Sequence, residues 1–365
     1  MKLGFLIYGS LDTLSGGYLY DRKLVEYFRA QGDTVEIISL PWRNYAAHLT
    51  DNFTFRLPPG LDLLIQDELN HPSLIAANLN KPYPVVSLVH HLRVSEQRPA
   101  WQNWLYRIVE KHYLQSVDGF IFNSQTTRGV VNKLVENSKP SVVAYPPTDR
   151  FGLGVTESEI RERAGVEKLR ILFLGNVIER KGLHTLLEAL QTLQAGNITL
   201  DVVGSLKTDP PYATMAQRYA DERCPSGAVT FHGALDDAAL TEKLKAAHVL
   251  VVPSSYEGFG IVYLEGMGFG LPAIGTTAGA APELIEDGRT GYLIEPEDAR
   301  ALAAKLLSLA SNRKTLIELS INAVQRYRQQ PGWEQTCLEI RAFLQKMQNL
   351  NTSDQIGRAS CRERV

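Results

Sequence analysis

The chain has 365 residues, a formal net charge of −2, 44% hydrophobic residues and 21% charged residues. This length exceeds that of a typical single domain and predicts two. The near-neutral charge argues against a general nucleic-acid binder, because such proteins carry basic patches that neutralise phosphates. Three scattered cysteines, Cys224, Cys337 and Cys361, form neither a disulfide framework nor a metal-binding pattern, so we expect a reducing cytoplasm.

Neither end of the chain indicates a membrane anchor. No stretch reaches the roughly 18 apolar residues that cross a bilayer, and residues 1–8 (MKLGFLIY) are typical of a buried first strand rather than of a signal peptide. Residues 356–365 (IGRASCRERV) switch abruptly to an Arg-rich string without pattern. We expect this tail to be non-native, from read-through at the end of an assembled gene fragment, and exclude it from the fold prediction.

Short apolar runs alternate with helical patterns from the first residues onward. Strands are predicted at 3–8, 35–40, 61–65, 85–89 and 119–122, and helices at 21–30 and 101–116. Continuous apolar runs of this length suit parallel strands that are buried on both faces. Their alternation with helices predicts βαβ units.

The pattern then restarts, because residues 170–175 (RILFLG) echo residues 2–9 (KLGFLIYG). Further strands are predicted at 198–203, 229–232, 249–252 and 273–274, and helices at 183–193, 301–309, 316–327 and 334–347. We predict an α/β protein with two doubly wound, Rossmann-like domains, 1–150 and 151–330. They join near a Pro- and Gly-rich segment at 145–154, and a last helix, about 334–350, crosses back to the first domain.

The segment 253–265 (PSSYEGFGIVYLE) is the richest candidate site. It follows a buried strand, and ligands of open α/β sheets bind at the carboxyl ends of strands. Gly258 and Gly260 allow a ligand close to the backbone, and the N–H groups of a helix start favour a diphosphate. If the stretch is helical, Glu257 and Glu265 lie about 12 Å apart, comparable to the hexose-to-ribose reach of a nucleotide sugar. Spacing alone leaves open an ordinary turn with two solvated glutamates.

The segment resembles the E-x7-E signature of retaining GT-B glycosyltransferases, specifically glycosyltransferase family 4, with Glu257 and Glu265 at the two acids. Other segments resemble family features in the expected order: an N-terminal strand and Gly16-Gly17 loop, a strand delivering an active-site histidine at His90, a strand ending in Asn123-Ser124, a donor-phosphate loop at 175–182 (GNVIERKG), and turns at 279–283 (GAAPE) and 287–293. Single pieces are weak, but their order over residues 1–350 is specific.

The resemblance implies the GT-B fold, with two Rossmann-like domains facing across a cleft, and a hexosyltransferase that uses a nucleotide-diphosphate sugar without metal or other cofactor. Glu257 would hold the sugar hydroxyls and Glu265 the ribose. Charge that develops on the departing phosphate would be stabilised by preorganised cations and N–H groups. The candidates for that role are Lys181, Gly258, Phe259 and Gly260. We find no Asp-x-Asp metal motif, and Asp236-Asp237 is typical of a helix cap.

Two positions leave alternatives open. Many family members have Arg after the first Gly of the phosphate loop, where this chain has Asn176. Arg180 either substitutes for that cation or is a solvated residue at a helix start. Glu283 is either a helix cap or a site residue.

His90 follows a strand and is expected to face the cleft. Near neutral pH it would hydrogen-bond the transferred sugar or help the acceptor hydroxyl to lose its proton. His91 alternates to the other side of an extended chain and is the weaker candidate. Asn123 and Ser124 are further candidates from the resemblance.

The acceptor is poorly specified. The helix at 98–113 carries aromatic and basic residues that could rest on a membrane surface, namely Trp101, Trp104, Tyr106, Arg107 and Lys111. Its Leu105, Ile108 and Val109 suit ordinary packing, which we favour. A glycan, a small molecule and a lipid-linked acceptor at the inner membrane face all stay open, as do the donor base, the sugar and the oligomeric state.

Three other classes deserve comparison. A sugar-nucleotide epimerase, a glycogen-synthase-like or a phosphorylase-like enzyme shares the two-domain plan, although we see no context for a pyridoxal-phosphate lysine. A nicotinamide-dependent dehydrogenase would need Gly-x-Gly-x-x-Gly directly after a strand, which neither 9–17 nor 175–182 supplies. An inactive scaffold or nucleotide-sugar-binding protein is the third, and Asn176 is the residue that leaves it open.

Overall fold

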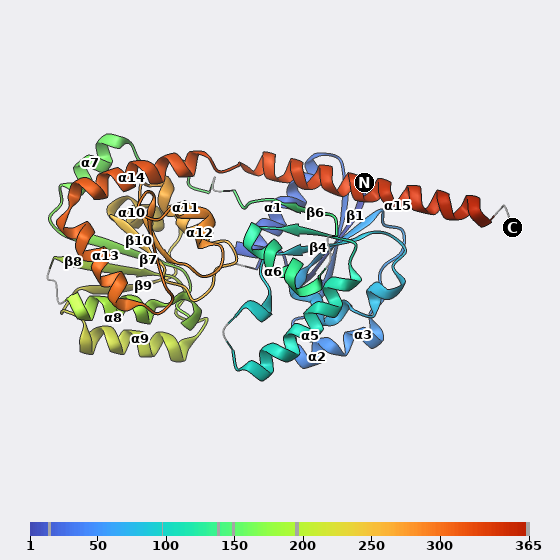
Figure 1. Ribbon diagram of the computed structural model, residues 1–365, viewed down its shortest axis with the longest axis horizontal. Coiled ribbons are helices and arrows are strands. Elements are labelled where there is room, and N and C mark those ends of the chain that lie inside the picture. Colours follow the sequence, from blue (N-terminus) through green and yellow to red (C-terminus); the bar gives the residue numbers. More distant parts are fainter. Residues whose placement is uncertain (14–15, 97, 137–138, 148–149, 194–196, 363–365) are drawn as a thin grey trace. The chain divides into compact units, whose positions relative to one another are not determined.

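The computed structural model describes residues 1–362 except 14–15, 97, 137–138, 148–149 and 194–196, with side chains described as far as residue 350. The chain divides into two compact units. The first comprises Met1–Pro147 and Pro331–Val365, and the second comprises Thr148–Gln330. Each unit contains one six-stranded parallel sheet with helices packed against it (Figure 1).

The first unit alternates strands and helices from its first residue. Its elements are β1 (Lys2–Tyr8), α1 (Gly16–Ala30), β2 (Thr34–Leu40), α2 (Tyr45–Leu49), α3 (Asp51–Thr54), β3 (Leu63–Asp67), η1 (Glu68–Asn70), α4 (His71–Leu74), η2 (Ala77–Asn80), β4 (Val85–Val89), η3 (Arg93–Ser95), α5 (Ala100–Ser116), β5 (Gly119–Phe122), α6 (Gln125–Val135), β6 (Ser141–Val143) and α15 (Trp333–Arg362).

Both faces of the first sheet are buried, because successive side chains of a strand point to opposite faces. The strand order is β2-β1-β3-β4-β5-β6. Phe5 and Ile7 of β1 pack in one apolar cluster with residues of α1 and α15, such as Leu344. Leu6 and Tyr8 pack in a second cluster with residues of α5 and α6. The chain reverses its direction of strand addition between β1 and β3, so the loops after these strands diverge.

Helix α15 is fixed to the first unit by apolar packing and by a buried ion pair. It contacts α1 and β6. The Arg341 guanidinium donates to both carboxylate oxygens of Asp33, at 2.7 and 3.1 Å, just after α1. The Arg341 cation holds the pKa of Asp33 below its ordinary value, although burial alone would raise it.

The second unit repeats the alternation. Its elements are α7 (Glu157–Ala164), β7 (Leu169–Leu174), η4 (Glu179–Lys181), α8 (Leu183–Leu193), β8 (Ile198–Val203), α9 (Pro210–Arg223), β9 (Val229–Gly233), α10 (Asp237–Ala246), β10 (Val249–Val251), α11 (Ile261–Gly268), β11 (Ala273–Thr276), α12 (Ala281–Leu284), β12 (Gly291–Ile294), α13 (Ala299–Ser311) and α14 (Arg313–Arg328).

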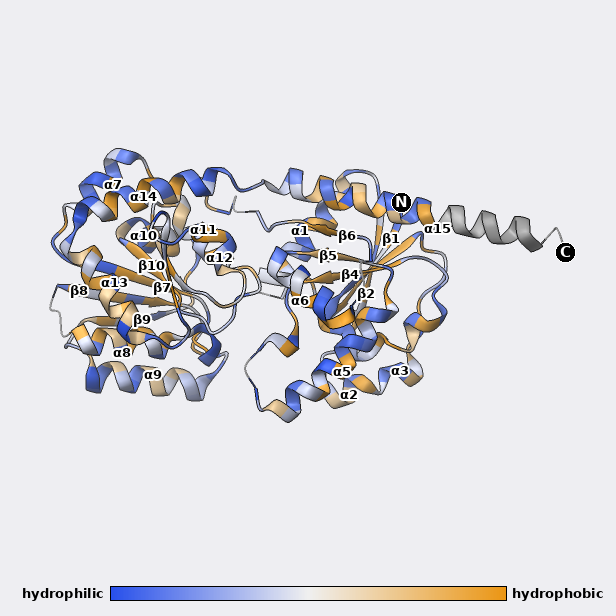
Figure 2. Cartoon of the chain, in the orientation of Figure 1, coloured by the Kyte–Doolittle hydropathy of each residue, from blue (hydrophilic) through white to orange (hydrophobic). Residues whose placement is uncertain are grey.

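The second sheet has the order β12-β11-β10-β7-β8-β9, so its switch point lies between β7 and β10. Helix α8 packs against α13 and α9, while α11 packs against α14. The strands of both sheets are predominantly hydrophobic (Figure 2), as burial on both faces requires. No helix in the described part of the chain combines the length and apolar character needed to cross a membrane.

Most predicted elements are confirmed, and the differences have physical reasons. The strands at 85–89, 119–122 and 198–203 have the predicted bounds. The third strand runs over Leu63–Asp67 rather than 61–65, because its polar last residues still pair with β4. Helix α1 begins at Gly16, five residues before the predicted start. The short edge strands β6 and β12 were not predicted.

The backbone of α15 is helical to Arg362. The tail expected to be non-native, 356–365, has its side chains outside the described residues, and its last three residues lie outside altogether.

Candidate functional site

The loops that follow β7 and β10 meet at the switch point of the second sheet. Lys181 ends the short helix η4, and its Nζ lies 2.6 Å from Oε1 of Glu257. The Ser254 hydroxyl donates to the same oxygen, also at 2.6 Å. Glu257 and Ser254 are 6% and 0% exposed, so this ion pair is shielded from water. The structure therefore brings together the lysine and the first glutamate that the sequence singled out.

Arg180 is directed toward the same carboxylate. Its Nη1 donates to the carbonyl of Tyr256 at 2.7 Å and lies 3.8 Å from Oε2 of Glu257. The Arg180 side chain is 29% exposed, so it is partly shielded by these contacts. The Asn176 side chain, at the place where the family often has arginine, is exposed.

Two positive charges oppose one buried carboxylate in this cluster. Burial alone would raise the pKa of Glu257, but Lys181 and then Arg180 hold that pKa below its ordinary value. Glu257 is therefore ionised at neutral pH, and the Lys181–Arg180–Glu257 group has a net charge of +1. Such a group attracts an anion such as a diphosphate.

Two glycines allow these loops to come into contact. Gly182 has φ 69°, and a Cβ there would lie 2.0 Å from the carbonyl oxygen of Pro253. Gly279 has φ 70°, and a Cβ there would lie 2.2 Å from the carbonyl oxygen of Glu257. That same oxygen accepts a hydrogen bond from Ala280 N at 2.8 Å. Any side chain at either glycine would push the Glu257 loop out of place.

The acidic spacing is not that of one continuous helix. Helix α11 begins at Ile261 after Gly260, which has φ 94°, so Glu257 precedes the helix and Glu265 lies inside it. The estimate of about 12 Å for a fully helical spacing therefore does not apply. Phe259, between the glycines, is 5% exposed, and the loop Gly258–Gly260 leads directly into the N-terminus of α11.

Glu265 has a basic partner that the sequence did not indicate. Arg150 Nη1 lies 3.3 Å from Oε1 of Glu265, and its Nη2 lies 2.6 Å from Oδ1 of Asp237. Burial raises the pKa of Glu265 despite the nearby guanidinium. Asp236 caps α10 by accepting from Ala239 N at 2.8 Å, which confirms its predicted role.

The candidate histidine of the first unit is paired with a buried aspartate. Nε2 of His90 lies 3.0 Å from Oδ1 of Asp21, whose side chain is fully buried. Burial alone would lower the pKa of His90, but Asp21, followed by Asp67 and Glu68, raises it to about 9. His90 is therefore an imidazolium at neutral pH, and His91 pairs separately with Glu96.

Two of the remaining first-unit candidates, Gly17 and Asn123, lie against His90. Gly17 lies in the first turn of α1 rather than in a loop, and a Cβ there would lie 3.3 Å from the His90 ring. Gly16 begins the same helix and faces open space. Asn123 donates to the His90 carbonyl at 2.6 Å, while Ser124 caps α6. These contacts hold the backbone around the imidazole.

Glu283 is the third residue of α12, and its carbonyl accepts from Arg326 Nη2 at 3.4 Å. The cap at this helix start is Ala280, without a side-chain hydrogen bond.

Sequence reasoning missed three partners: Ser254, Arg150 and Asp21. Asp21 follows the Gly-Gly pair by four residues, but nothing in the sequence pairs it with a histidine 69 residues away.

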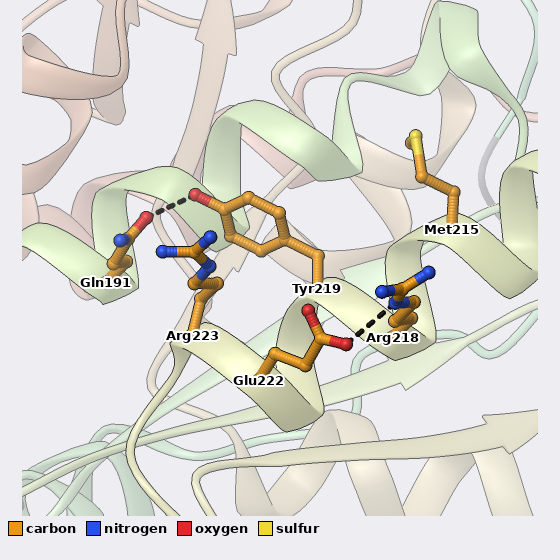
Figure 3. A pocket seen from close by; sticks show the side chains of 6 residues that line it. All are labelled: Gln191, Met215, Arg218, Tyr219, Glu222 and Arg223. Atoms are coloured by element: carbon orange, nitrogen blue, oxygen red, sulfur yellow. Dashed lines mark hydrogen bonds and ion pairs between the residues drawn. The ribbon is translucent and has the colours of Figure 1, made fainter.

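A separate surface hollow lies beside α9 and the end of α8 (Figure 3). Its lining residues are Gln191, Met215, Arg218, Tyr219, Glu222 and Arg223. The Tyr219 hydroxyl bonds to Gln191, and Arg218 pairs with Glu222 at 2.7 Å. None of these residues belongs to the Lys181–Glu257 group.

The second unit is similar in sequence to known glycosyltransferases. Residues 156–326 match the family model for Glycosyl transferases group 1. The MMP alpha-(1->4)-mannosyltransferase of Mycolicibacterium hassiacum is 27% identical over 278 residues, which is 72% of this chain and 66% of that protein. The chain spans about half the length of other curated relatives that it matches, including D-inositol 3-phosphate glycosyltransferases.

Solved structures share the fold over nearly the whole chain. Sucrose-phosphate synthase from Thermosynechococcus elongatus superposes with a TM-score of 0.77 at 21% identity, covering 95% of this chain and 98% of that one. Anabaena Alr3699/HepE in complex with UDP-glucose gives 0.75 at 19% identity, covering 95% and 100%. The two six-stranded parallel sheets are those of a GT-B fold, and residues 156–326 are similar to group 1 glycosyl transferases.

Proposed function

We propose that this protein transfers a hexose, with retention of anomeric configuration, from a nucleotide-diphosphate sugar to an acceptor hydroxyl, in the manner of glycosyltransferase family 4 and in polysaccharide or glycolipid synthesis. The observation that carries the proposal is the buried contact of Lys181 and Arg180 with Glu257 at the switch point of the second sheet. Relatives that transfer mannose and a structural neighbour that binds UDP-glucose support this substrate class.

The donor would displace part of the ion pair. In the free protein Glu257 neutralises Lys181, so the lysine is already oriented and desolvated when a diphosphate arrives. Lys181 and Arg180 would then stabilise the charge that develops on the leaving phosphate, with help from the N–H groups of Gly258, Phe259 and Gly260. Glu257 would turn to the sugar hydroxyls. Because two side-chain cations face the phosphates, we propose a metal-independent transfer.

Glu265 would accept the ribose hydroxyls. Its pairing with Arg150 opposes the rise in the pKa of Glu265 that burial causes. Asn176, in the loop after β7, and Glu283, in α12, are further candidates for the proposed donor site.

His90 would act as a hydrogen-bond donor to the transferred sugar. Its raised pKa, caused by Asp21, makes it an imidazolium at neutral pH, and an imidazolium has no lone pair with which to accept a proton. Of the two roles expected from the sequence, we therefore propose the first. The acceptor hydroxyl would lose its proton to another group, such as the departing phosphate.

An acceptor at a membrane surface would suit α5. The expectation that Leu105 and Ile108 pack inside is wrong: they are 46% and 37% exposed, beside Trp101 at 64% and Trp104 at 61%. The inward face of α5 is instead formed by Glu110, Tyr113 and Leu114. We propose that the outer face, with Arg107 and Lys111 at its edge, rests on an anionic bilayer at the inner membrane face.

Lys181→Ala removes the cation nearest Glu257. We expect turnover of the donor to fall by about a hundredfold or more, the scale for losing one preorganised charge stabiliser. Hydrolysis or transfer is followed with a radiolabelled nucleotide sugar. Lys314→Ala, at an exposed position of α14, is the matched control. Normal turnover in the Lys181 variant would remove this residue from the mechanism.

Gly279→Ala tests the close approach of two loops. The new Cβ would strike the Glu257 carbonyl, so we expect nucleotide affinity to fall by about tenfold or more together with thermal stability. Gly288→Ala is the control, because Gly288 has φ 74° but nothing within 4 Å of a Cβ. Both substitutions introduce similar backbone strain, because each places an alanine in a left-handed conformation. Equal nucleotide affinity in the two would contradict the proposed importance of the contact.

The membrane contact is tested by co-sedimentation with phosphatidylglycerol vesicles. Replacing Trp101 and Trp104 together with Ala should lower binding by about tenfold or more, because each buried indole contributes over 1 kcal/mol. Leu338→Ala, which removes a 56% exposed side chain from α15, should leave binding unchanged. Equal binding by the double variant and the parent would exclude this face.

A further inference from the structure

Three buried titratable side chains of the first unit meet outside the proposed donor site. Glu68 lies on η1, His71 begins α4 and Glu110 lies in the middle of α5. They are 4%, 1% and 0% exposed. One donor atom from each lies within 4.8 Å of the other two. The fold thus brings together two carboxylates and an imidazole from three elements, and all three side chains are buried.

Hydrogen bonds within the protein leave part of this cluster unsatisfied. The Glu110 oxygens accept from Arg93 N at 2.7 Å and Val94 N at 3.2 Å. His71 uses Nδ1 toward the Glu68 carbonyl, at 3.0 Å, and Nε2 toward the Tyr45 hydroxyl, at 2.9 Å. Oε1 of Glu68 lies 3.0 Å from Nδ1 of His71 yet has no hydrogen-bond partner among the described residues. A buried carboxylate oxygen without a donor is costly.

An arginine side chain beside the cluster contacts two aromatic rings. The nearby Arg93 guanidinium lies over the rings of Tyr45 and Tyr106, 5.1 and 5.2 Å from their centroids. A cation between the two carboxylates would satisfy Oε1 of Glu68.

We propose that Glu68, His71 and Glu110 bind one divalent transition-metal ion. A set of two carboxylates and one imidazole suits Zn²⁺ or Mn²⁺, whereas Mg²⁺ prefers an all-oxygen shell that keeps several waters. Ligands at about 2.1 Å from an ion lie roughly 3 to 3.5 Å from their neighbours. Glu68 and His71 already have this spacing, and a Glu110 oxygen lies within 4.8 Å of both donor atoms.

The surroundings of His71 fit ligation through Nδ1. Metal binding there leaves a proton on Nε2, which would donate to the Tyr45 hydroxyl and fix the ring orientation. Through the two hydrogen bonds to Glu110, the ion would also tie down the turn at Arg93 and Val94, three residues after His90. The proposed role is therefore to order the His90 loop. It lies in the other unit from the donor site and does not depend on the proposed transfer.

The test is metal content of the full-length protein. After chelator treatment and dialysis against zinc sulfate, elemental analysis should find one zinc per chain, and thermal unfolding should shift upward by several degrees. Glu110→Gln and His71→Gln should each lose the zinc. Glu96→Gln is the matched control, because this nearby acid pairs with His91 and Arg98 and lies outside the cluster. Magnesium at the same concentration should not bind.

A second measurement guards against variants that fail to fold. The parent protein loaded with Co²⁺ should show a visible spectrum of oxygen and nitrogen ligation without a thiolate band, which separates this site from binding at Cys224 or Cys337. Substoichiometric zinc in the parent, a thiolate band, or zinc retained by both cluster variants would overturn the proposal. Nucleotide binding, measured on the same samples, reports on the donor site separately.

Discussion

The ion pair between Lys181 and Glu257 is the contact on which the second unit's site depends. It joins two loops that leave neighbouring strands in different directions, and it does so only because Gly182 and Gly279 let backbones approach within van der Waals distance. Ser254 and Arg180 complete the surroundings of the carboxylate. A buried pair of this kind stabilises little by itself, but leaving either partner alone would be costly. We infer that the pair keeps Lys181 oriented and shielded from water until a diphosphate binds.

The first unit uses the opposite electrostatic arrangement. Acidic side chains gather after β3 and around His90, with Asp21, Asp67 and Glu68 all raising the pKa of the histidine. A protonated imidazole can donate a hydrogen bond to a sugar hydroxyl but cannot serve as a base. Another group would therefore have to accept the proton of the acceptor hydroxyl. The proposed metal ion would lie between Glu68 and Glu110, in the other unit from the donor site.

The sequence predicted the architecture well because buried parallel strands are continuous apolar runs, and those at 85–89, 119–122 and 198–203 have the expected bounds. The prediction was wrong where buried strand residues are polar, as at the end of β3. It also missed short edge strands such as β12. Lys181 and Glu257 were each singled out by a family resemblance, which did not predict that they pair. Arg150 and Asp21 could not be foreseen, because their partners lie 115 and 69 residues away and only the fold brings them together.

The central claim is that the second unit binds a nucleotide diphosphate through side-chain cations. Thermal unfolding with UDP, GDP, ADP and dTDP, each with and without EDTA, tests it most directly. A nucleotide at a hundred times its dissociation constant stabilises the folded protein by about 2.7 kcal/mol. The account predicts a selective increase in unfolding temperature for one base, with the same nucleotide-induced increment in EDTA even if the chelator lowers the starting temperature. No increase with any nucleotide, or an increment that disappears in EDTA, would contradict it.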